Sequence, residues 1–333
     1  MNLVMEFAQP GTPDILRSAE RLVMPPAAGE VRIRQTMAGV NFVDIYHRSG
    51  LYPLPLPAVP GVEATGVVEA VAEDVTDLKV GDRVAYAGLP AGSYATVRTL
   101  PRGRVLRLGD DLPDEKVAGA LLRGLTAHML LVTVGRVKAG DTVLIHAAAG
   151  GLGLILTRWA KRIGARTIGT VGSPEKAALA RRHGLDHAIP YKETDFVDET
   201  LRLTGGRGVD FAIDGIGSET TTKTLKVLRA FGTLANVGQV AGPVPAIEPA
   251  ALNNRFFIRP SILALTQDGE AYHAAAREWF ALLRDGFDVP AGHTYTLAEA
   301  AAAHRDMEAG RTTGAVRLAI PGGRGQSGTM LTA

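Results

Sequence analysis

The chain has 333 residues, of which 46% are hydrophobic and 21% charged, and its formal net charge is +2 at pH 7. This length suggests two domains, and the composition is normal for a folded protein with a full core. The near balance of charges gives no reason to expect a nucleic-acid-binding surface. The absence of cysteine excludes disulfides, a cysteine nucleophile and cysteine-based zinc sites, and it favours a cytoplasmic location.

Residues 1–20 lack the apolar core of a signal peptide, so we expect no leader. The most apolar stretch, residues 117–137, contains Arg123, His128 and Arg136. We interpret it as a buried helix with flanks and expect no membrane span.

The first part of the chain has the pattern of a β-rich domain. Short β-branched or alternating runs, broken by Gly and Pro, predict strands within residues 31–42, 61–71 and 82–88. Residues 52–61 contain four prolines, which fix φ and remove hydrogen-bond donors. This stretch is therefore predicted to be a loop.

From about Thr126 the pattern changes to alternating strands and helices. We predict helices at Glu175–His183 and Ser218–Ala230. The predicted strands are Thr142–His146, Arg166–Val171, His187–Pro190, Val209–Asp214, Gly232–Val237 and Pro260–Leu265. Alternation of this kind predicts an α/β fold with a doubly wound parallel sheet covered on both faces.

The alternation ends after about Asp285. Residues 293–310 are rich in Ala and predict one helix, and residues 314–320 predict a closing strand that returns to the first domain. Residues 321–333 are rich in Gly and Ser, and we expect them to be disordered. The expected division is a β-rich domain of residues 1–125 and 290–333 beside a doubly wound domain of residues 126–289, with the ligand site between them.

A glycine cluster, "AAAGGLG" at residues 147–153, joins the first strand of the alternating part to a helix. Ala148 stands where the dinucleotide fingerprint has its first Gly, whereas Gly150 and Gly153 keep the second and third positions, and Gly151 adds a further close approach. Backbone N–H groups and the helix N-terminus bind phosphate, so Ala148 need not abolish binding. The alternative is a tight turn that serves only helix packing.

The end of the second strand of this part indicates which nucleotide is bound. An NAD site has an acidic residue there, but this sequence has Gly172 and Ser173, with Lys176 in the following helix. A hydroxyl and an ammonium group suit a 2′-phosphate, which predicts NADPH. Ser173 also fits the N-cap of that helix, and the two roles are compatible.

Several motifs carry a resemblance to a known family: "NFVDIYHRSG", "PGVEATGVV", "VGDRV", "AAAGGLG", "GSPEK" and "GGRGVDFAIDGIG". On these residues the chain resembles the zinc-independent NADPH:quinone oxidoreductases, similar to zeta-crystallin, of the medium-chain dehydrogenase/reductase superfamily. The resemblance implies a GroES-like β-rich catalytic domain and a Rossmann NADPH-binding domain. It also implies no metal, because Asn41 and Val62 stand where zinc-dependent relatives have a Cys and a His ligand, and the lobe with four Cys is missing.

The resemblance also implies site residues. Asn41 is expected beside the nicotinamide, and Tyr46 and Tyr52 beside a quinone, so these three are the candidate catalytic residues. The residues implied to bind the cofactor are Asn41, Gly150, Gly151, Leu152, Gly153, Gly172, Ser173, Lys176, Tyr191, Leu263, Leu265 and Arg311. Two positions depart from the family pattern: Leu152 is larger than usual, and His128 lies near a position that is often Tyr.

The resulting prediction is an NADPH-dependent quinone reductase that binds a small quinone and forms a homodimer through the strand at Pro260–Leu265. An NADPH-dependent reductase of α,β-unsaturated carbonyls and a non-catalytic NADPH-binding protein remain as alternatives. Local alternatives also remain. Asp44 and Arg48 have the spacing of a helical ion pair, and Tyr46 can serve packing alone.

Overall fold

A computed structural model of the chain describes residues 1–290 and 292–322. The chain divides into two compact units. The first consists of residues 1–122 together with the segment that begins at Leu263, and the second consists of residues 123–262. The segment 263–289, which we expected in the second domain, therefore lies with the first. The reason is helix α10 (Gly269–Arg284), where the Tyr272 hydroxyl accepts a hydrogen bond from Ala87 N (2.9 Å) and donates one to Arg104 O (3.1 Å).

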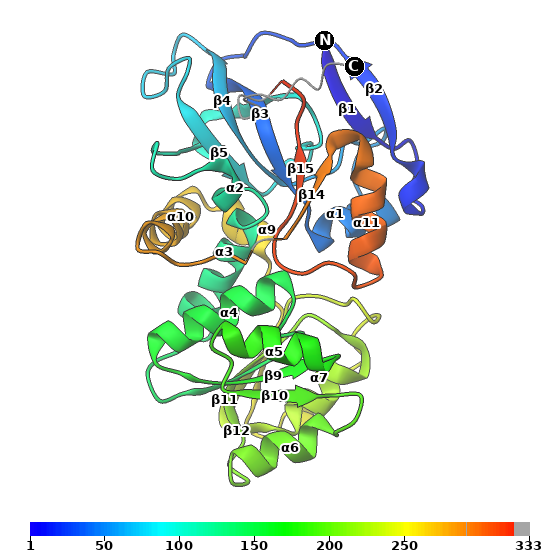
Figure 1. Ribbon diagram of the computed structural model, residues 1–333, viewed down its shortest axis with the longest axis vertical. Coiled ribbons are helices and arrows are strands. Elements are labelled where there is room, and N and C mark those ends of the chain that lie inside the picture. The colour runs from blue at the N-terminus through cyan, green and yellow to red at the C-terminus, as the bar shows by residue number, and fades with distance from the viewer. Residues whose placement is uncertain (291, 323–333) are drawn as a thin grey trace, which may run out of the picture. The chain divides into compact units, whose positions relative to one another are not determined.

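The first unit is built on a mainly antiparallel sheet in the order β14-β15-β3-β4-β5-β7, with β6 also paired to β3. Figure 1 labels β3, β4, β5, β14 and β15 of this sheet. A separate hairpin-like pair is formed by β1 and β2. The strands are β1 Asn2–Glu6, β2 Arg17–Arg21, β3 Glu30–Gly39, β4 Glu63–Val71, β5 Arg83–Ala87, β6 Val97–Pro101, β7 Leu106–Arg107, β14 His293–Thr296 and β15 Val316–Ala319. Alternate residues of β3, such as Val31 and Ile33, are fully buried in one apolar core, as expected for a sheet with one packed face.

The helices of this unit are short apart from α10. They are α1 Phe42–Ser49, α2 Asp114–Val117, α9 Ile262–Gln267, α10 and α11 Ala300–Glu308. Helix α3 (Leu121–His128) starts at the end of this unit and continues into the second as a π-helical segment, Met129–Val134. The apolar stretch 117–137 is therefore helical for most of its length, and the proline-rich loop 52–61 contains no helix or strand. Both features confirm the predictions.

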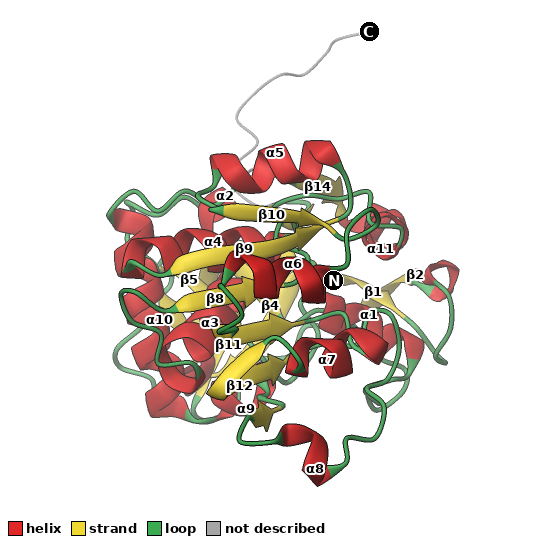
Figure 2. Cartoon of the chain, turned by 90° about the horizontal axis from the view of Figure 1, so that it is seen from below, coloured by secondary structure: helices red, strands yellow, loops and turns green. Residues whose placement is uncertain are grey.

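The second unit contains a six-stranded parallel sheet in the order β10-β9-β8-β11-β12-β13. In chain order this is 3-2-1-4-5-6, the strand order of the Rossmann fold. The strands are β8 Thr142–Ile145, β9 Arg166–Val171, β10 His187–Pro190, β11 Val209–Asp214, β12 Leu228–Asn236 and β13 Phe256–Ile258. The predicted doubly wound sheet is confirmed, and Figure 2 shows the strands β10 to β12 in this order.

Helices cover this sheet on both faces. The helices are α4 Gly151–Ile163, α5 Pro174–Arg182, α6 Phe196–Leu203, α7 Ser218–Leu225 and α8 Pro249–Leu252. Residues of α6 and α7, among them Leu201 and Leu225, share an apolar cluster with Leu144, Ile168 and Ile189 of the sheet. Helices α4 and α5 contact β8, β9 and β10 outside this cluster. A sheet buried in this way needs a continuous apolar run in its strands, which Val143–Ile145 of β8 provide.

Three predicted elements are wrong. The sixth strand is β13, and residues 262–265 of the predicted strand Pro260–Leu265 belong to helix α9 instead. The predicted helix at 218–230 ends at Leu225, and β12 begins at Leu228. The predicted helix at 293–310 starts with β14 and a 3-10 turn before α11, because residues 293–296 pair with β15. The predicted closing strand is confirmed as β15, which pairs with β3 of the first unit.

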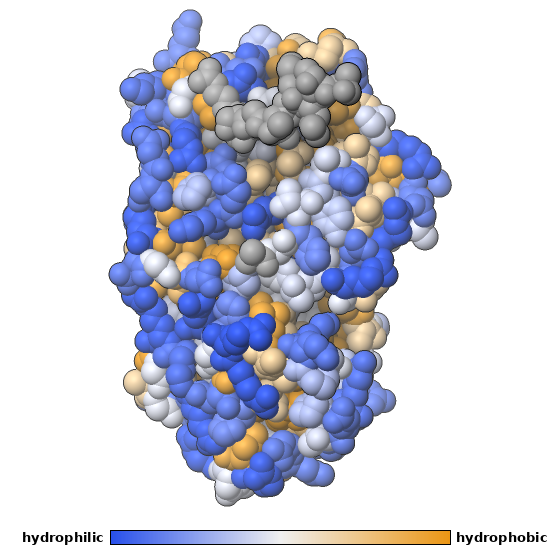
Figure 3. Space-filling model, in the orientation of Figure 1, coloured by the Kyte–Doolittle hydropathy of each residue, from blue (hydrophilic) through white to orange (hydrophobic). Residues whose placement is uncertain are grey.

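Most of the surface in view is polar. On the face shown in Figure 3, hydrophobic residues occur in small groups between hydrophilic ones. Among the described residues, no helix is both long and apolar enough to cross a bilayer. The predicted disorder of residues 321–333 concerns a segment that lies, from residue 323 on, outside the described residues.

Candidate active site

The glycine turn follows β8 and leads directly into α4. Ala147 has a left-handed backbone with φ 51°, and the Gly150 N–H donates to Ala147 O (2.8 Å), which closes the turn. We expected Ala148 to replace the turn glycine, but the strained position belongs to Ala147. Ala148 is instead fixed by a hydrogen bond from its N–H to Thr170 O (3.0 Å). An alanine tolerates such a position at a modest energetic cost.

The start of α4 has the geometry of a phosphate site. A Cβ added at Gly153 would lie 2.4 Å from Ala147 O and 2.8 Å from Ala148 Cα, so the helix passes the turn only because Gly153 has no side chain. Gly150 is the N-cap, and the N–H groups of Gly151 and Leu152 in the first turn have no acceptor within the helix. The turn therefore combines unpaired donors with the positive end of a helix, which suits the pyrophosphate of a dinucleotide.

The ends of β9 and β10 lie beside this turn. Gly172 follows β9, and Ser173 is the N-cap of α5, where its Oγ accepts from Lys176 N (3.3 Å). Tyr191 follows β10, and a Cβ at Gly172 would meet the Tyr191 hydroxyl at the ordinary contact distance of 3.5 Å. The Tyr191 side chain is 53% exposed. The structure thus brings Gly172, Ser173, Lys176 and Tyr191 to the edge of the sheet where the glycine turn lies.

Glu175 adds a negative charge at this edge of the sheet, and the prediction of NADPH from the sequence did not take it into account. Ser173 donates a hydrogen bond that lowers the pKa of the neighbouring Glu175 carboxyl, which is exposed at the start of α5. A carboxylate here opposes a 2′-phosphate, whereas Lys176 favours it. Neither end of β9 nor the N-cap of α5 carries the acidic residue that would bind a ribose 2′-hydroxyl.

In the first unit, helix α1 brings together the three candidate catalytic residues. Asn41 precedes the helix as its N-cap and forms a capping box with Asp44, whose Oδ2 accepts from Asn41 N (2.8 Å). Tyr46 lies within the helix and is 9% exposed. The rings of Tyr46 and Tyr52 meet edge to face with centroids 5.3 Å apart, and Tyr52 N donates to Tyr46 O (3.1 Å).

A buried polar network holds this helix. The Tyr94 hydroxyl lies 3.3 Å from Asp44 Oδ2 and 2.9 Å from His304 Nε2. Burial, reinforced by the Asp44 charge, raises the pKa of Tyr94 well above its usual value, so its hydroxyl keeps its proton. Burial lowers the pKa of His304 to about 3, so the imidazole is neutral near pH 7. If Tyr94 donates to Asp44, then Nε2 of His304 donates to Tyr94.

Arg48, at the end of α1, has partners other than the helical one we considered. Its Nη1 donates to Gly11 O (2.9 Å), and its Nη2 bonds Glu308 of α11. The guanidinium side chain is 2% exposed. These bonds fasten α1 to α11 and to the segment that follows β1.

The remaining predicted site residues lie elsewhere. Leu263 and Leu265 are on helix α9 and not on the strand we predicted, because that strand is β13. Arg311 binds Asp306 through Nε (3.0 Å) and Nη2 (2.6 Å) at the surface of the first unit. His128 ends α3, is 8% exposed and packs edge to face with Trp159 at 6.1 Å.

The donor set near Asn41 does not fit zinc. Zinc sites use thiolate, imidazole or carboxylate ligands, usually four of them. Here the positions expected for Cys and His ligands hold an amide and the apolar Val62, and the Asn41 amide donates to Glu63. Among residues 1–290 and 292–322, no cluster of three His, Cys, Asp or Glu side chains could hold a metal. No step of the reaction is therefore assigned to a metal.

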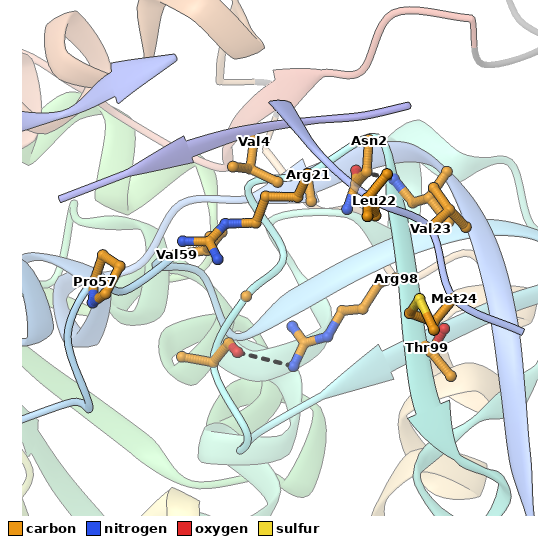
Figure 4. A pocket seen from close by; sticks show the side chains of 14 residues that line it. Asn2, Val4, Arg21, Leu22, Val23, Met24, Pro57, Val59, Arg98 and Thr99 are labelled. Carbon is orange, nitrogen blue, oxygen red and sulfur yellow. Dashed lines mark hydrogen bonds between the residues drawn. The ribbon is translucent and has the colours of Figure 1, made fainter. Parts of the chain in front are cut away.

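A separate pocket of about 390 Å³ lies in the first unit, lined by β2, β6 and the loops near Pro57 and Ala91 (Figure 4). The Arg98 guanidinium faces it, but it stacks on Tyr86 at 5.1 Å and bonds the carbonyls of Pro90 and Ala91. Arg98 therefore fixes the loop at residues 90–91. None of the predicted site residues lines this pocket.

Comparison with known proteins identifies the family. Residues 27–133 match the alcohol dehydrogenase GroES-like domain, and residues 151–278 match the zinc-binding dehydrogenase family. A quinone oxidoreductase of Pseudomonas aeruginosa is 39% identical over 94% of this chain and 98% of its own length. The chain belongs to the quinone oxidoreductase family. The predicted family and the predicted pairing of a GroES-like with a Rossmann domain are confirmed.

Other relatives show the range of this family. A 2-haloacrylate reductase of a Burkholderia species is 40% identical over 92% of this chain and 96% of its own length. Among solved structures, the Escherichia coli quinone oxidoreductase complexed with NADPH has a TM-score of 0.92 and 35% identity, and the match covers 95% of this chain and 99% of that one. A relative named 2-haloacrylate reductase is therefore about as similar to this chain as one named quinone oxidoreductase.

Sequence reasoning missed two parts of the site. Glu63 lies in the motif "PGVEATGVV", but only the neighbouring Val62 was interpreted. Glu63 directly follows Val62, the position where zinc-dependent relatives have a His ligand, and this neighbourhood could have identified it as a candidate site residue. The pairing of Tyr94 with His304 joins residues far apart in the chain, and no local pattern indicates it.

Proposed function

We propose that this protein is an NADPH-dependent quinone reductase that works without zinc. The observation that supports the proposal most is the set of residues that follow β8 and β9 in the Rossmann sheet. The phosphate-binding turn at Gly150–Gly153 stands beside Ser173 and Lys176, where an NAD enzyme has an acid. The family membership supports the same reaction, and the relative solved with NADPH supports the cofactor.

The described residues divide the work of holding NADPH. The N–H groups of Gly151 and Leu152 would meet the pyrophosphate, and Ser173 and Lys176 the 2′-phosphate. Tyr191, which is half exposed beside Gly172, would pack against the adenosine end. We further propose that Leu263, Leu265 and Arg311 contact the cofactor. The two leucines lie on helix α9, and Arg311 is hydrogen-bonded to Asp306.

When bound, NADPH supplies the reducing equivalents for the acceptor. The chain's own residues bind and orient. Asn41 is held by Glu63 and by the capping box, so its position beside the nicotinamide is fixed before binding. Tyr46 and Tyr52 pack against each other and form a wall for a flat ring. A quinone readily carries negative charge on oxygen, so a strongly activated acid is not required.

A reductase of α,β-unsaturated carbonyls is the second candidate, and the 2-haloacrylate reductase among the relatives favours it. Enone reduction ends with a proton on carbon, so a placed acid contributes more to the rate. A non-catalytic NADPH-binding role is the third.

The deciding experiment follows NADPH oxidation with a panel of ortho-quinones, para-quinones and enones. Turnover of quinones well above enones is expected. Preference for enones selects the second candidate, and binding of NADPH without turnover of either class selects the third.

We also propose a homodimer. The sheet edge is β13 and not residues 260–265, and it exposes Phe256 (56%) and Ile258 (39%). An apolar edge strand with unpaired backbone groups needs to be covered, and a second copy can cover it. A dimer by light scattering at micromolar protein is expected, and a monomer would contradict it.

The cytoplasmic location and the independence from zinc stay predictions. Retention of activity after dialysis against a chelator tests the latter.

A further inference from the structure

The Glu63 carboxylate sits between two hydrogen-bond donors. It begins β4, is 1% exposed, and accepts at Oε1 from Asn41 Nδ2 (2.7 Å). Its Oε2 accepts from the backbone N–H of Leu122 (3.1 Å), in the first turn of α3. Both contacts require Glu63 to act as an acceptor, which an ionised carboxylate does on both oxygens.

The surrounding structure makes room for this carboxylate and favours its charge. A Cβ at Gly39 would come within 2.2–2.6 Å of the Glu63 side chain, so only glycine leaves space for it. Burial lowers the pKa of Arg317, but the charges of Glu115 and Glu63 oppose that effect, so a guanidinium lies within electrostatic reach. A carboxylate at the N-terminal turn of α3 is also favoured by the helix dipole.

A side-chain amide can present either its nitrogen or its oxygen to a neighbour, and its hydrogen-bond partners decide which. Because Glu63 only accepts, Asn41 must turn Nδ2 toward it. The amide oxygen is then left for the Asp44 N–H in the capping box and for a ligand. Reversal of the amide would face an acceptor with an acceptor and a donor with a donor.

We propose that Glu63 is a positioning residue: it fixes the orientation of the Asn41 amide and so sets which atom Asn41 offers to the cofactor. The functional part of this inference rests on the proposed function, because it takes Asn41 to lie beside the nicotinamide. The orientation itself is a property of the first unit alone.

The test is a double-mutant cycle in which the donor and acceptor are exchanged. In Glu63→Gln, one end of the new amide must place its NH₂ against either Asn41 Nδ2 or Leu122 N, so one donor meets another. In Asn41→Asp, two carboxylates meet at the position of the 2.7 Å contact. In the double variant, the introduced glutamine can accept from Leu122 N and donate to the introduced aspartate, which again offers an oxygen at the start of α1. The double variant also keeps the negative charge of the pair.

NADPH affinity is the main readout, measured by fluorescence titration together with KM and kcat for a quinone. In each single variant the group that residue 41 offers to NADPH is reversed or displaced, and loss of such a hydrogen bond should weaken NADPH binding about ten- to a hundredfold. The double variant should recover most of that loss. Glu69→Gln is the matched control, because Glu69 lies on the same strand and pairs with Arg32 at the surface. It should leave NADPH affinity unchanged.

Several outcomes overturn the proposal. Glu63→Gln with NADPH affinity within about twofold of wild type would show that the orientation does not matter. A double variant whose loss is the sum of the two single losses would show that the residues act independently. If Glu63→Gln does not fold, thermal unfolding of Asn41→Asp and of the double variant decides. A double variant no more stable than Asn41→Asp contradicts the proposal. If the wild type reduces no quinone, the proposed function fails, but the cycle on NADPH affinity still tests Glu63.

Discussion

The glycine turn of the second unit and the network around α1 in the first unit are built by different means. The turn uses backbone: the N–H groups of Gly151 and Leu152 in the first turn of α4 have no acceptor within the helix, and the glycines offer no functional side chain. The network uses buried side chains, with Asp44, Tyr94 and His304 in contact and largely excluded from water. The comparison teaches that the turn is sensitive to added volume, whereas the network is sensitive to changes in charge and protonation.

The largest effect is expected from added volume at the turn. Gly153→Ala puts a Cβ 2.4 Å from Ala147 O, and backbone cannot yield as a flexible side chain would. We expect a loss of about 1–3 kcal/mol in the free energy of unfolding, together with loss of NADPH binding. Thermal unfolding and fluorescence titration measure the two effects.

Gly150→Ala is the matched control for this prediction. Its Cβ would meet only Ala147 O at 3.2 Å, which a small shift relieves. If both variants bind NADPH equally well, close packing at Gly153 is not what shapes the turn.

Acid should destabilise both units through buried histidines, one of which, His146, directly precedes the glycine turn. Burial lowers the pKa of His47 to about 4, of His304 to about 3 and, in the second unit, of His146 to about 4. The unfolded chain binds these protons near pH 6.5. Stability is therefore complete above that pH, and it falls as the pH drops toward 4, by up to about 1.4 kcal/mol per pH unit for each histidine. Denaturant unfolding at several pH values measures the slope.

His304→Gln removes one of these groups and should flatten the slope between about pH 6.5 and about pH 5. His293→Gln, at an exposed histidine of β14, is the matched control, and its slope is compared with that of His304→Gln. A slope that is the same in all three proteins would show that His304 takes up its proton without unfolding.

Lys176, which follows the end of β9, tests the comparison between the two regions. It is a charged side chain in a site otherwise built from backbone. Lys176→Ala should weaken NADPH binding by roughly 1.5–3 kcal/mol and leave NADH nearly unchanged. Glu175→Gln should act in the opposite direction and strengthen NADPH modestly, because it removes a negative charge near the phosphate. Both affinities are measured by titration. Equal weakening of NADPH and NADH by Lys176→Ala would mean that Lys176 supports the structure of α5 only.

The smallest effect is expected at the tyrosines of α1 and its following loop. Tyr46→Phe and Tyr52→Phe keep the ring contact at 5.3 Å and remove only a hydroxyl. With a quinone, each should cost far less than the roughly 10²–10⁴-fold that is typical of a general acid. Steady-state kinetics with quinones and enones measure the effect. A thousandfold loss on every acceptor would make the hydroxyl an essential acid and favour the enone reductase.

The sequence predicted the second unit better than the first. Its sheet order follows from alternating strands and helices, which are local patterns. The failure at Pro260–Leu265 was also local, because a short apolar run does not distinguish a strand from a helix. The true edge strand follows Asn253 and Asn254, both with positive φ, a turn signal that we did not use.

The candidate site was predictable only where the residues lie close in the chain. Asn41, Tyr46 and Tyr52 fall within one helix and its loop, and the structure brings them together. Glu63 and His304 reach α1 through long-range contacts that depend on the whole sheet of the first unit. No spacing rule connects such residues, so tertiary structure was needed to find them.

The strand order of the first unit has a consequence for synthesis on the ribosome. β15 pairs with β3 on one side and with β14 on the other, so residues 316–319 join a sheet that begins at Glu30. The second unit lies wholly between these segments in the chain and needs none of them for its own sheet. Domains generally fold as units during synthesis. The Rossmann unit can therefore fold on the growing chain before β15 is made and pairs with β3. The contacts that α1 makes with the C-terminal part of the first unit then form last.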